Sequence, residues 1–323
     1  MAQDEKSTEE RGRPRRFPLA AYVLCAVPLI GVVELGLHIK QTTIDVVPDS
    51  DWTAARDAIK GDVRPEDLVI FAPFWADPIG REHFGDAYAG IDREARPDET
   101  RFARAFEVGI HGHHRPELAG WKKTSEKQVG KITIGVYENP APAKVLTDLV
   151  KLIDPSQVTV ARVENGIESP CAFQRGVGAP GGLGVPQGIA VPGDKFVCSG
   201  GGYVGVAVLH ALDHHPHLCI WATPQGAASG MRVKFSKVTF GSALHGHTGI
   251  QWVSERTPSP QDRMFVSFTS GGRPIGTSVH RVGIGWNAFE HPTPELAGKT
   301  ADLVAEVSAS GPARPFCFEA DTR

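Results

Sequence analysis

The sequence lacks the short motifs that accompany most catalytic chemistry. It contains no G-x-S-x-G elbow for a nucleophilic serine, and local context places no Ser/His/Asp set. No two cysteines are spaced as C-x-x-C, which is the motif of zinc ribbons and thioredoxin-like proteins. No self-similar period of roughly 20–50 residues is present, which excludes a solenoid. The sequence therefore predicts a protein without a complete catalytic set, and no cofactor is expected.

An excess of charge of either sign is also missing. Lys and Arg number 34 against 37 Asp and Glu, so the net charge of -3 over 323 residues provides no attraction to nucleic acid. Gly and Pro are plentiful, at 36 and 25 residues, which favours strands and turns over helical bundles. The chain is long enough for two soluble domains.

One long apolar run is present, from Phe17 to Ile39, and it follows a basic tail of sequence RGRPRR. A membrane-spanning helix needs about 20 mostly apolar residues, and basic residues flank its cytoplasmic side. The run predicts a single transmembrane helix at 17–39 in the lipid bilayer. Residues 1–16 would then be cytoplasmic and the bulk of the chain extracytoplasmic, periplasmic in a bacterium. A cleaved secretory signal is the alternative, but no small-x-small pair ends the run. A buried core helix is a weaker alternative, because no polar residues alternate along the run.

The cysteines fit an exported protein. Cys25 lies in the apolar run, and the remaining four are even in number. An oxidising compartment permits two disulfides among them, with three pairings open. Buried free thiols are the alternative. The disulfide candidates are Cys171, Cys198, Cys219 and Cys317.

The pattern of residues 42–155 predicts a small α/β domain. A helix is expected at Asp51–Lys60, with Trp52, Ala55 and Ile59 on one face, and a second at Ala143–Ile153. Between them, short apolar runs predict buried strands. These strands are expected at Leu68–Ala72, Ala105–Ile110 and Ile132–Tyr137.

This order of a capped helix, the run DLVIFAPFW, a strand with an aromatic and then KITIGVYENP resembles the soluble extracytoplasmic region of polytopic lipid-sugar-dependent glycosyltransferases. The resemblance covers about a hundred residues. In those enzymes the catalytic carboxylates lie in the multi-span membrane part, which a chain with one span does not have. The resemblance therefore implies a glycan-handling scaffold without transferase chemistry.

Two groups in this half are candidate sites. Trp75, Asp77 and Arg81 follow a buried strand, where α/β sheets commonly place ligands, and they are candidate binding residues. His111, His113 and His114 are candidate metal ligands, since neighbouring imidazoles bind Zn²⁺. The alternative for these histidines is a solvated loop, because they lack the helical spacing of H-E-x-x-H.

Residues 156–323 predict an antiparallel β-sandwich, specifically a jelly roll, so that the whole chain belongs to the α+β class. In Met231–Phe240, Val233, Phe235 and Val238 can share one face only with a register shift. The glycine-rich stretch Gly176–Gly188 lacks a phosphate-loop Lys-Ser/Thr and is expected to be a flexible connection. The candidate strands are Val158–Val163, Lys195–Cys198, Tyr203–Leu209, Leu218–Thr223, Met231–Phe240, Gly249–Glu255, Arg263–Phe268, Gly276–His280, Ala301–Val307 and Pro315–Ala320.

The final hundred residues, with a hairpin into L-x-G, a Gly-Gly turn and a late GIGWNAFE, look like galactose-binding-type jelly-roll modules. Such modules bind sugars through loop aromatics, because a flat ring stacks on the apolar face of a pyranose. Trp252 and Trp286 are the candidates here, and packing in the sandwich core is the alternative. The histidines of ALDHHPHLC are expected to be exposed in a polar turn.

Together these features predict a membrane-anchored extracytoplasmic protein that binds glycans or a cell-envelope partner without catalysis. One alternative is a metal-dependent envelope hydrolase that uses the histidine clusters. Another is a structural subunit that docks on a multi-span glycosyltransferase through its single helix, which Pro28 and Glu34 within the apolar run would suit.

Overall fold

The computed structural model describes residues 19–323 except 96–97, 177–191, 214, 258–260 and 313. The chain divides into two compact units, Met1–Pro48 and Asp49–Arg323. The domain boundary expected at residue 155 lies inside the second unit and stays a prediction. The expected flexible connection at 176–188 falls outside the described residues apart from Gly176.

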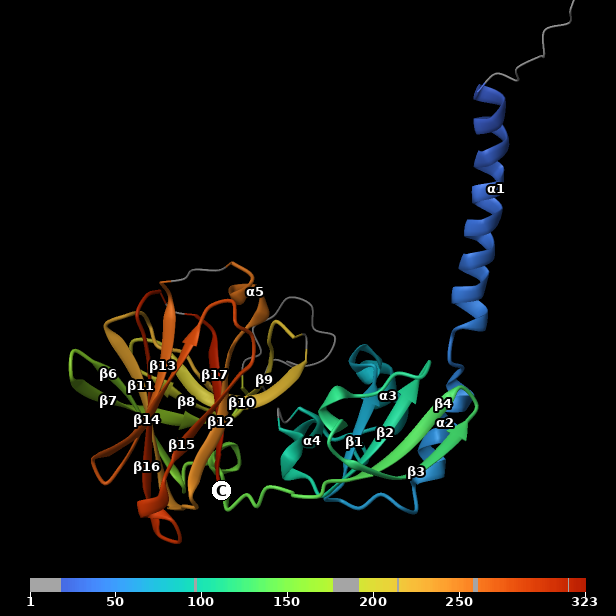
Figure 1. Cartoon of the computed structure of the whole chain (residues 1–323). Helices are drawn as coiled ribbons and strands as arrows, with labels where there is room; N and C mark the ends of the chain where they lie inside the picture. Colours follow the sequence, from blue (N-terminus) through green and yellow to red (C-terminus); the bar gives the residue numbers. More distant parts are fainter. Residues whose placement is uncertain (1–18, 96–97, 177–191, 214, 258–260, 313) are drawn as a thin grey trace, which may run out of the picture. The chain divides into compact units, whose positions relative to one another are not determined.

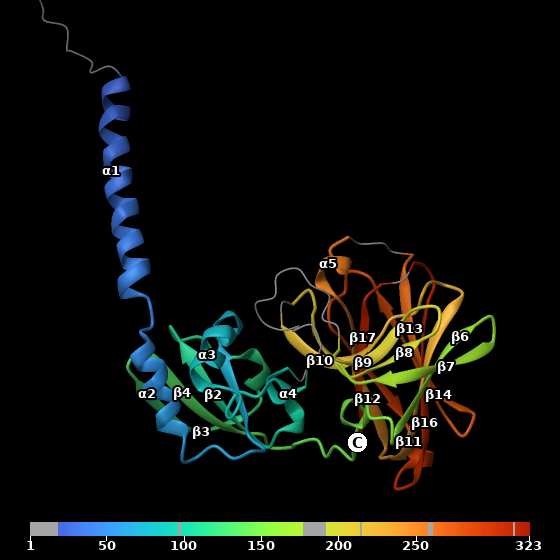
Figure 2. The ribbon, with the colours of Figure 1, turned by 180° about the vertical axis from the view of Figure 1, so that it is seen from behind.

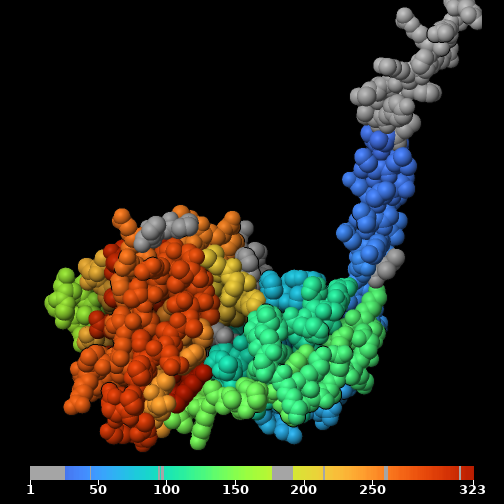
Figure 3. Space-filling view, in the orientation of Figure 1, coloured from blue at the N-terminus to red at the C-terminus, as the bar shows by residue number. Residues whose placement is uncertain are grey.

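In the first unit, α1 (Leu19–Ile39) is followed by a short π-helical turn, η1 (Lys40–Ile44). The apolar side chains of its second half are exposed, between 49% for Ile39 and 67% for Val32. Figure 3 draws this helix in blue. Over the part of the chain that the structure describes, no helix combines the length and apolar character needed to cross a membrane. The membrane anchor stays a prediction.

The second unit begins with a small mixed sheet and its helices (Figures 1 and 2). The sheet has the order β1-β2-β4-β3, with β1 and β2 parallel and the other neighbours antiparallel. Helix α2 contacts β4 and α3, and α3 contacts β1. These elements are α2 (Asp49–Ile59), β1 (Leu68–Ala72), η2 (Phe74–Ala76), α3 (Asp77–Phe84), α4 (Ile91–Glu94), η3 (Glu99–Arg101), β2 (Arg104–Ile110), η4 (Pro116–Leu118), β3 (Lys122–Val129) and β4 (Ile132–Glu138).

Most of this layer follows from its apolar pattern. α2 buries Trp52, Ala55 and Ile59 on one face, as expected, and the predicted strands form as β1, β2 and β4. Strand β3 was not predicted, because seven of its eight residues are exposed. Its strand geometry comes from hydrogen bonding to β4. The helix expected at Ala143–Ile153 is wrong.

In place of that helix the chain forms β5 (Thr147–Asp148) and the 3-10 turn η5 (Leu149–Leu152). Thr147 pairs with Thr322, while Leu149 and Val150 are buried in the core of the large sheet. Packing against a distant strand therefore overrides the local helical pattern.

The rest of the unit is a large antiparallel sheet with strand order β14-β13-β16-β11-β6-β7-β8-β9-β10-β17-β12-β15, and β5 pairs with β17. Strands and short helices follow in chain order. They are β6 (Val158–Glu164), β7 (Ile167–Gln174), β8 (Lys195–Cys198), β9 (Tyr203–His210), β10 (Pro216–Ala222), β11 (Ser229–Thr239), β12 (Ala243–Ile250), α5 (Trp252–Glu255), β13 (Arg263–Ser270), β14 (Arg273–Arg281), β15 (Asn287–Pro292), η6 (Pro294–Leu296), β16 (Thr300–Ala309) and β17 (Phe316–Thr322).

This sheet curls over on itself and encloses the main core, as in a jelly roll (Figure 1). Its two edge strands, β14 and β15, meet through Ser278 Oγ and His291 Nε2 at 2.9 Å. Phe235, Phe268 and Phe318 are fully buried in the core. At about 25 cal/mol per Å² of buried apolar surface, aromatic side chains of this size dominate the stability of such a core. The predicted antiparallel β-sandwich is confirmed.

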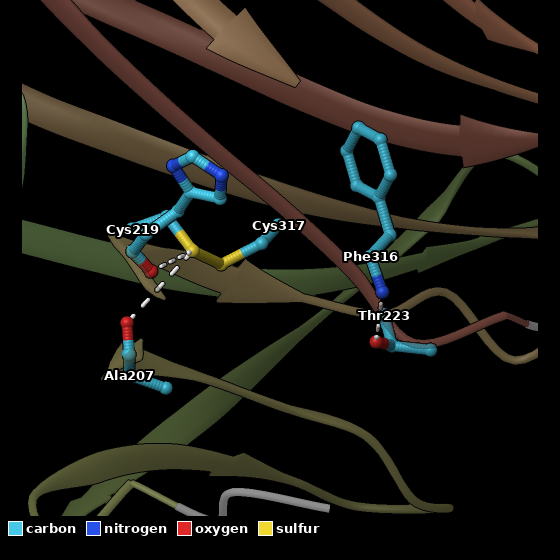
Figure 4. Close-up of a disulfide and its surroundings, with 6 residues drawn as sticks. Ala207, Cys219, Thr223, Phe316 and Cys317 are labelled. Carbon is cyan, nitrogen blue, oxygen red and sulfur yellow. Dashed lines mark hydrogen bonds between the residues drawn. A yellow bond between two sulfur atoms is a disulfide. The ribbon is translucent and has the colours of Figure 1, made fainter. Parts of the chain in front are cut away.

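The four cysteines expected on the exported side are joined as Cys171–Cys198, between β7 and β8, and Cys219–Cys317, between β10 and β17. Figure 4 shows the second disulfide, with the Phe316 N–H donating to Thr223 Oγ1 at 3.2 Å beside it. Both sulfur bridges link strands that are already neighbours in the sheet.

The register shift expected in β11 is confirmed, between Phe235 and Val238, and Val233, Phe235 and Val238 are all fully buried. The strand expected at Gly249–Glu255 is wrong beyond its first residues, because β12 ends at Ile250 and α5 begins at Trp252. Strands β7, β12 and β15 were not predicted.

Candidate functional site

A cavity of about 230 Å³ lies in the second unit, where loops of the small sheet meet β10, β12 and the segment that precedes β15. The small sheet supplies side chains from α3, η3 and the loop that follows β2. The large sheet supplies the turn before β10 and the first residues of β10, one residue each of β12 and β15, and Trp286. The lining residues are Asp77, Glu99, Arg115, Glu117, Asp213, His215, Pro216, His217, His247, Trp286 and Ala288.

Two imidazoles held by carboxylates flank Trp286. His217 Nε2 lies 2.8 Å from Asp213 Oδ2, and His247 Nδ1 lies 2.8 Å from Glu319 Oε1. The ring of His217 is parallel to Trp286 at 4.2 Å between centroids, and that of His247 is 10° from parallel at 6.0 Å. Hydrogen bonds to carboxylates fix the orientation of both imidazoles.

Two polar atoms at this cluster have no hydrogen-bond partner among the described residues. They are Nδ1 of His217 and Nε1 of Trp286, and both atoms are buried. In the tautomer in which Nε2–H of His217 donates to Asp213, Nδ1 is an acceptor, whereas the Trp286 indole offers a donor. A ligand that both donates and accepts hydrogen bonds would satisfy the two atoms.

The turn that carries Trp286 is fixed by a buried carboxylate. Glu255 Oε1 accepts from Gly283 N–H at 3.2 Å, Gly285 N–H at 2.9 Å and His280 Nε2 at 3.1 Å. Gly283 and Gly285 have φ of 97° and 72°, a region that favours glycine. The sequence GIGW therefore specifies a tight turn, which presents Trp286 to the cavity.

On the opposite wall, one guanidinium is shared by two carboxylates. Arg115 donates through Nε and Nη2 to both oxygens of Glu117, at 3.1 and 3.2 Å, and its Nη1 lies 3.8 Å from Asp77 Oδ1. Burial opposes ionisation of Glu117, but the hydrogen bond and charge of Arg115 outweigh it and lower the pKa of Glu117. The positive charge of Arg115 is therefore compensated by two carboxylates that line the same cavity.

Glu99 differs from these carboxylates. Burial and the charge of Glu117 raise its pKa to about 7, against a smaller opposing effect of its own backbone N–H and of Arg115. Two nearby residues, one on each side of it in the chain, are anchored to the large sheet. Asp98 pairs with Arg323, and Arg101 Nη2 lies 3.0 Å from Asp148 Oδ2. These pairs fix η3 and hold Glu99 at the cavity.

The structure brings together two of the binding residues predicted from sequence, Asp77 and Trp286. Trp75 is 54% exposed in η2 and does not line the cavity, and Arg81 Nη1 donates to the carbonyl of Ala89 at 2.7 Å. Trp252 is in α5, with the Arg256 guanidinium 5.1 Å from its ring centroid.

The three metal candidates lie in an exposed loop after β2. His114 Nδ1 is 2.8 Å from Glu107 Oε2, and His111 has a positive φ of 53°. Over the described residues, no group of three or more His, Cys, Asp or Glu side chains is placed to hold a metal ion.

The exposure expected for the ALDHHPHLC turn is wrong for His217, which is only 4% exposed because it packs between Asp213 and Trp286. Sequence reasoning also missed Glu99, Arg115 and Glu117. They lie in or next to the short 3-10 turns η3 and η4, and no local signal shows that their side chains converge.

An aromatic side chain extends the site outward. Phe74 is 41% exposed, and its ring centroid is 4.8 Å from that of the cavity residue His215. Burial and the nearby Arg115 lower the pKa of His215, which leaves its ring neutral at neutral pH. The cavity thus has polar walls, and Phe74 lies next to the lining residue His215.

No family model and no curated protein matches the sequence. Similar solved structures include the xylan-binding module CBM15, at 4% identity over 56% of this chain and 97% of that chain, with a TM-score of 0.27. The CBM51 from a Clostridium perfringens GH95 in complex with methyl-galactose is 10% identical over 49% of this chain and 99% of that chain, with a TM-score of 0.24. Xylanase 10C of Cellvibrio japonicus, in complex with xylopentaose, is 8% identical over 32% of this chain, with a TM-score of 0.23, and only 22% of that enzyme's chain is covered.

Proposed function

We propose that this protein binds a carbohydrate in the cavity beside Trp286, without acting on it chemically. The observation that carries the proposal is the pair of unpartnered atoms there, the Nδ1 acceptor of His217 and the Nε1–H donor of Trp286. Sugar hydroxyls donate and accept at once, and sugar C–H faces suit aromatic edges such as Phe74. Polar walls with a few convergent groups and an aromatic edge are what such a ligand requires.

Binding by the full-length protein, purified in detergent, to a glycan array tests the proposal. A Phe74→Ala variant should bind the captured glycan about fivefold more weakly, because an aromatic contact contributes about 1 kcal/mol. Ile167→Ala is the matched control, since Ile167 is 70% exposed on β7 and does not line the cavity. Failure of the protein to retain any glycan would overturn the proposal.

We also propose that the protein is extracytoplasmic and anchored by Phe17–Ile39, with its amino terminus in the cytoplasm. The basic tail and apolar run support this placement, and so do two disulfides, which persist in oxidising compartments. Extraction of membranes with alkaline carbonate is the test. An anchored chain stays in the pellet, and release into the supernatant contradicts the anchor.

A further inference from the structure

Carboxyl groups outnumber guanidinium and ammonium groups among the side chains that line the cavity. Asp77, Glu117 and Glu99 contribute carboxyl groups from the small sheet, and Asp213 contributes one from the turn before β10. One guanidinium, that of Arg115, lines the cavity, and it pairs with Glu117 and Asp77. Buried carboxylates without compensation are costly, so a cation is the ligand group that these walls favour.

Among the carboxyl groups that line the cavity, Glu99 is the one considered as the partner of such a cation. No ion pair of Glu99 is found among the residues that the structure describes, whereas Asp98 and Arg101 on either side of it are paired. The nearby charge of Glu117 and burial both disfavour its ionisation. A positive group placed beside Glu99 would relieve both effects.

A second observation supports a ligand rich in donors. His217 is 4% exposed, lines the cavity and has its Nδ1 acceptor without a partner. An ammonium group has three N–H donors and no acceptor, which matches a wall made mainly of carboxylates and this imidazole nitrogen. Charge-assisted hydrogen bonds of this kind are about twice as strong as neutral ones.

We propose that the carbohydrate bound here is an amino sugar with a free ammonium group, and that Glu99 is its charged partner. This inference rests on the proposed carbohydrate binding at the same cavity. Glu99 acts as a specificity-determining residue because it distinguishes –NH₃⁺ from –OH or an N-acetyl group on otherwise identical sugars.

Three tetrasaccharides with the same β-1,4 backbone test the inference: chitosan tetrasaccharide, chitin tetrasaccharide and cellotetraose. They carry an ammonium, an N-acetyl and a hydroxyl group at C2. Isothermal titration calorimetry of the full-length protein in detergent at pH 6.5 should give at least about tenfold tighter binding of chitosan tetrasaccharide. Glu99→Gln should remove that preference and leave binding of the uncharged sugars unchanged.

Glu295→Gln is the matched control, since Glu295 is an exposed carboxylate in η6 that does not line the cavity. Glu99→Asp keeps the charge and should retain part of the preference, which separates charge loss from misfolding. Equal or tighter binding of an uncharged sugar, in this set or on the array, overturns the inference while carbohydrate binding stands. Absence of binding to any glycan overturns both.

Discussion

Individual titratable residues of the cavity should leave a signature in the pH dependence of stability. Burial raises the pKa of Glu99 to about 7 in the folded chain, from an ordinary value of 4.5. Because the unfolded chain releases this proton at lower pH, stability from this group is lost as pH rises from about 4.5 to about 7 and is then constant. Allowing for its partial exposure, we expect Glu99→Gln to be about 2 kcal/mol more stable than wild type at pH 8 and equal to it at pH 4. Urea unfolding at both pH values measures this, and parallel pH profiles for the two proteins would contradict it.

A second residue-scale prediction concerns Glu255, which is 1% exposed and holds the turn before Trp286. Replacement by Ala leaves the N–H groups of Gly283 and Gly285 without an acceptor, and we expect a loss of about 3 kcal/mol in unfolding free energy. Glu255→Gln keeps an acceptor oxygen and should cost less. Equal stability of the Ala variant and wild type, measured by urea unfolding, would show that this carboxylate does not fix the turn.

Among the elements, apolar runs predicted β1, β2 and β4 because buried strands are apolar on both faces. Strands β3 and β7 were not predicted, since their residues are mostly exposed and their strand geometry depends on a partner. Hydrophobic periodicity in a sequence indicates which residues are buried. It does not indicate an exposed strand that forms through hydrogen bonds to its neighbour.

The two disulfides make an element-scale prediction. Cys219–Cys317 spans 98 residues, and Cys171–Cys198 spans 27. Since constraint of the unfolded chain grows with the logarithm of loop length, replacing the first pair by Ala should destabilise by about 1 kcal/mol more than replacing the second. Guanidinium unfolding of both double variants against wild type decides the order, and a smaller loss for the Cys219/Cys317 variant would reverse it.

Over the whole molecule, the site depends on the attachment of η3 to the large sheet. Arg101 and Asp148 form this attachment, and their side chains are 12% and 7% exposed. The fold class could be predicted from local patterns, but the convergence of Glu99 and Arg115 on Trp286 could not. That convergence depends on contacts between segments far apart in sequence, and no local periodicity encodes it.

Removal of this attachment should therefore weaken both stability and binding. Arg101→Gln removes the ion pair between Arg101 and the buried Asp148, at a cost of about 3 kcal/mol, and we expect glycan affinity to fall because Glu99 loses its fixed position. Arg56→Gln, in an exposed pair with Asp57, should change stability by less than about 0.5 kcal/mol. Unfolding and calorimetry measure the two effects. Loss of stability with unchanged glycan affinity would show that the Arg101–Asp148 pair does not position Glu99 for binding.

The position of β17 in the sheet also has a consequence for how the protein is made. β17 lies between β10 and β12 and pairs with β5 as well, yet it follows all three along the chain. During synthesis or export, the facing edges of β10 and β12 exist before the strand that joins them. Unpaired edges invite pairing with other chains, so the interval before β17 emerges is the one in which this protein is most exposed to aggregation and most dependent on chaperones.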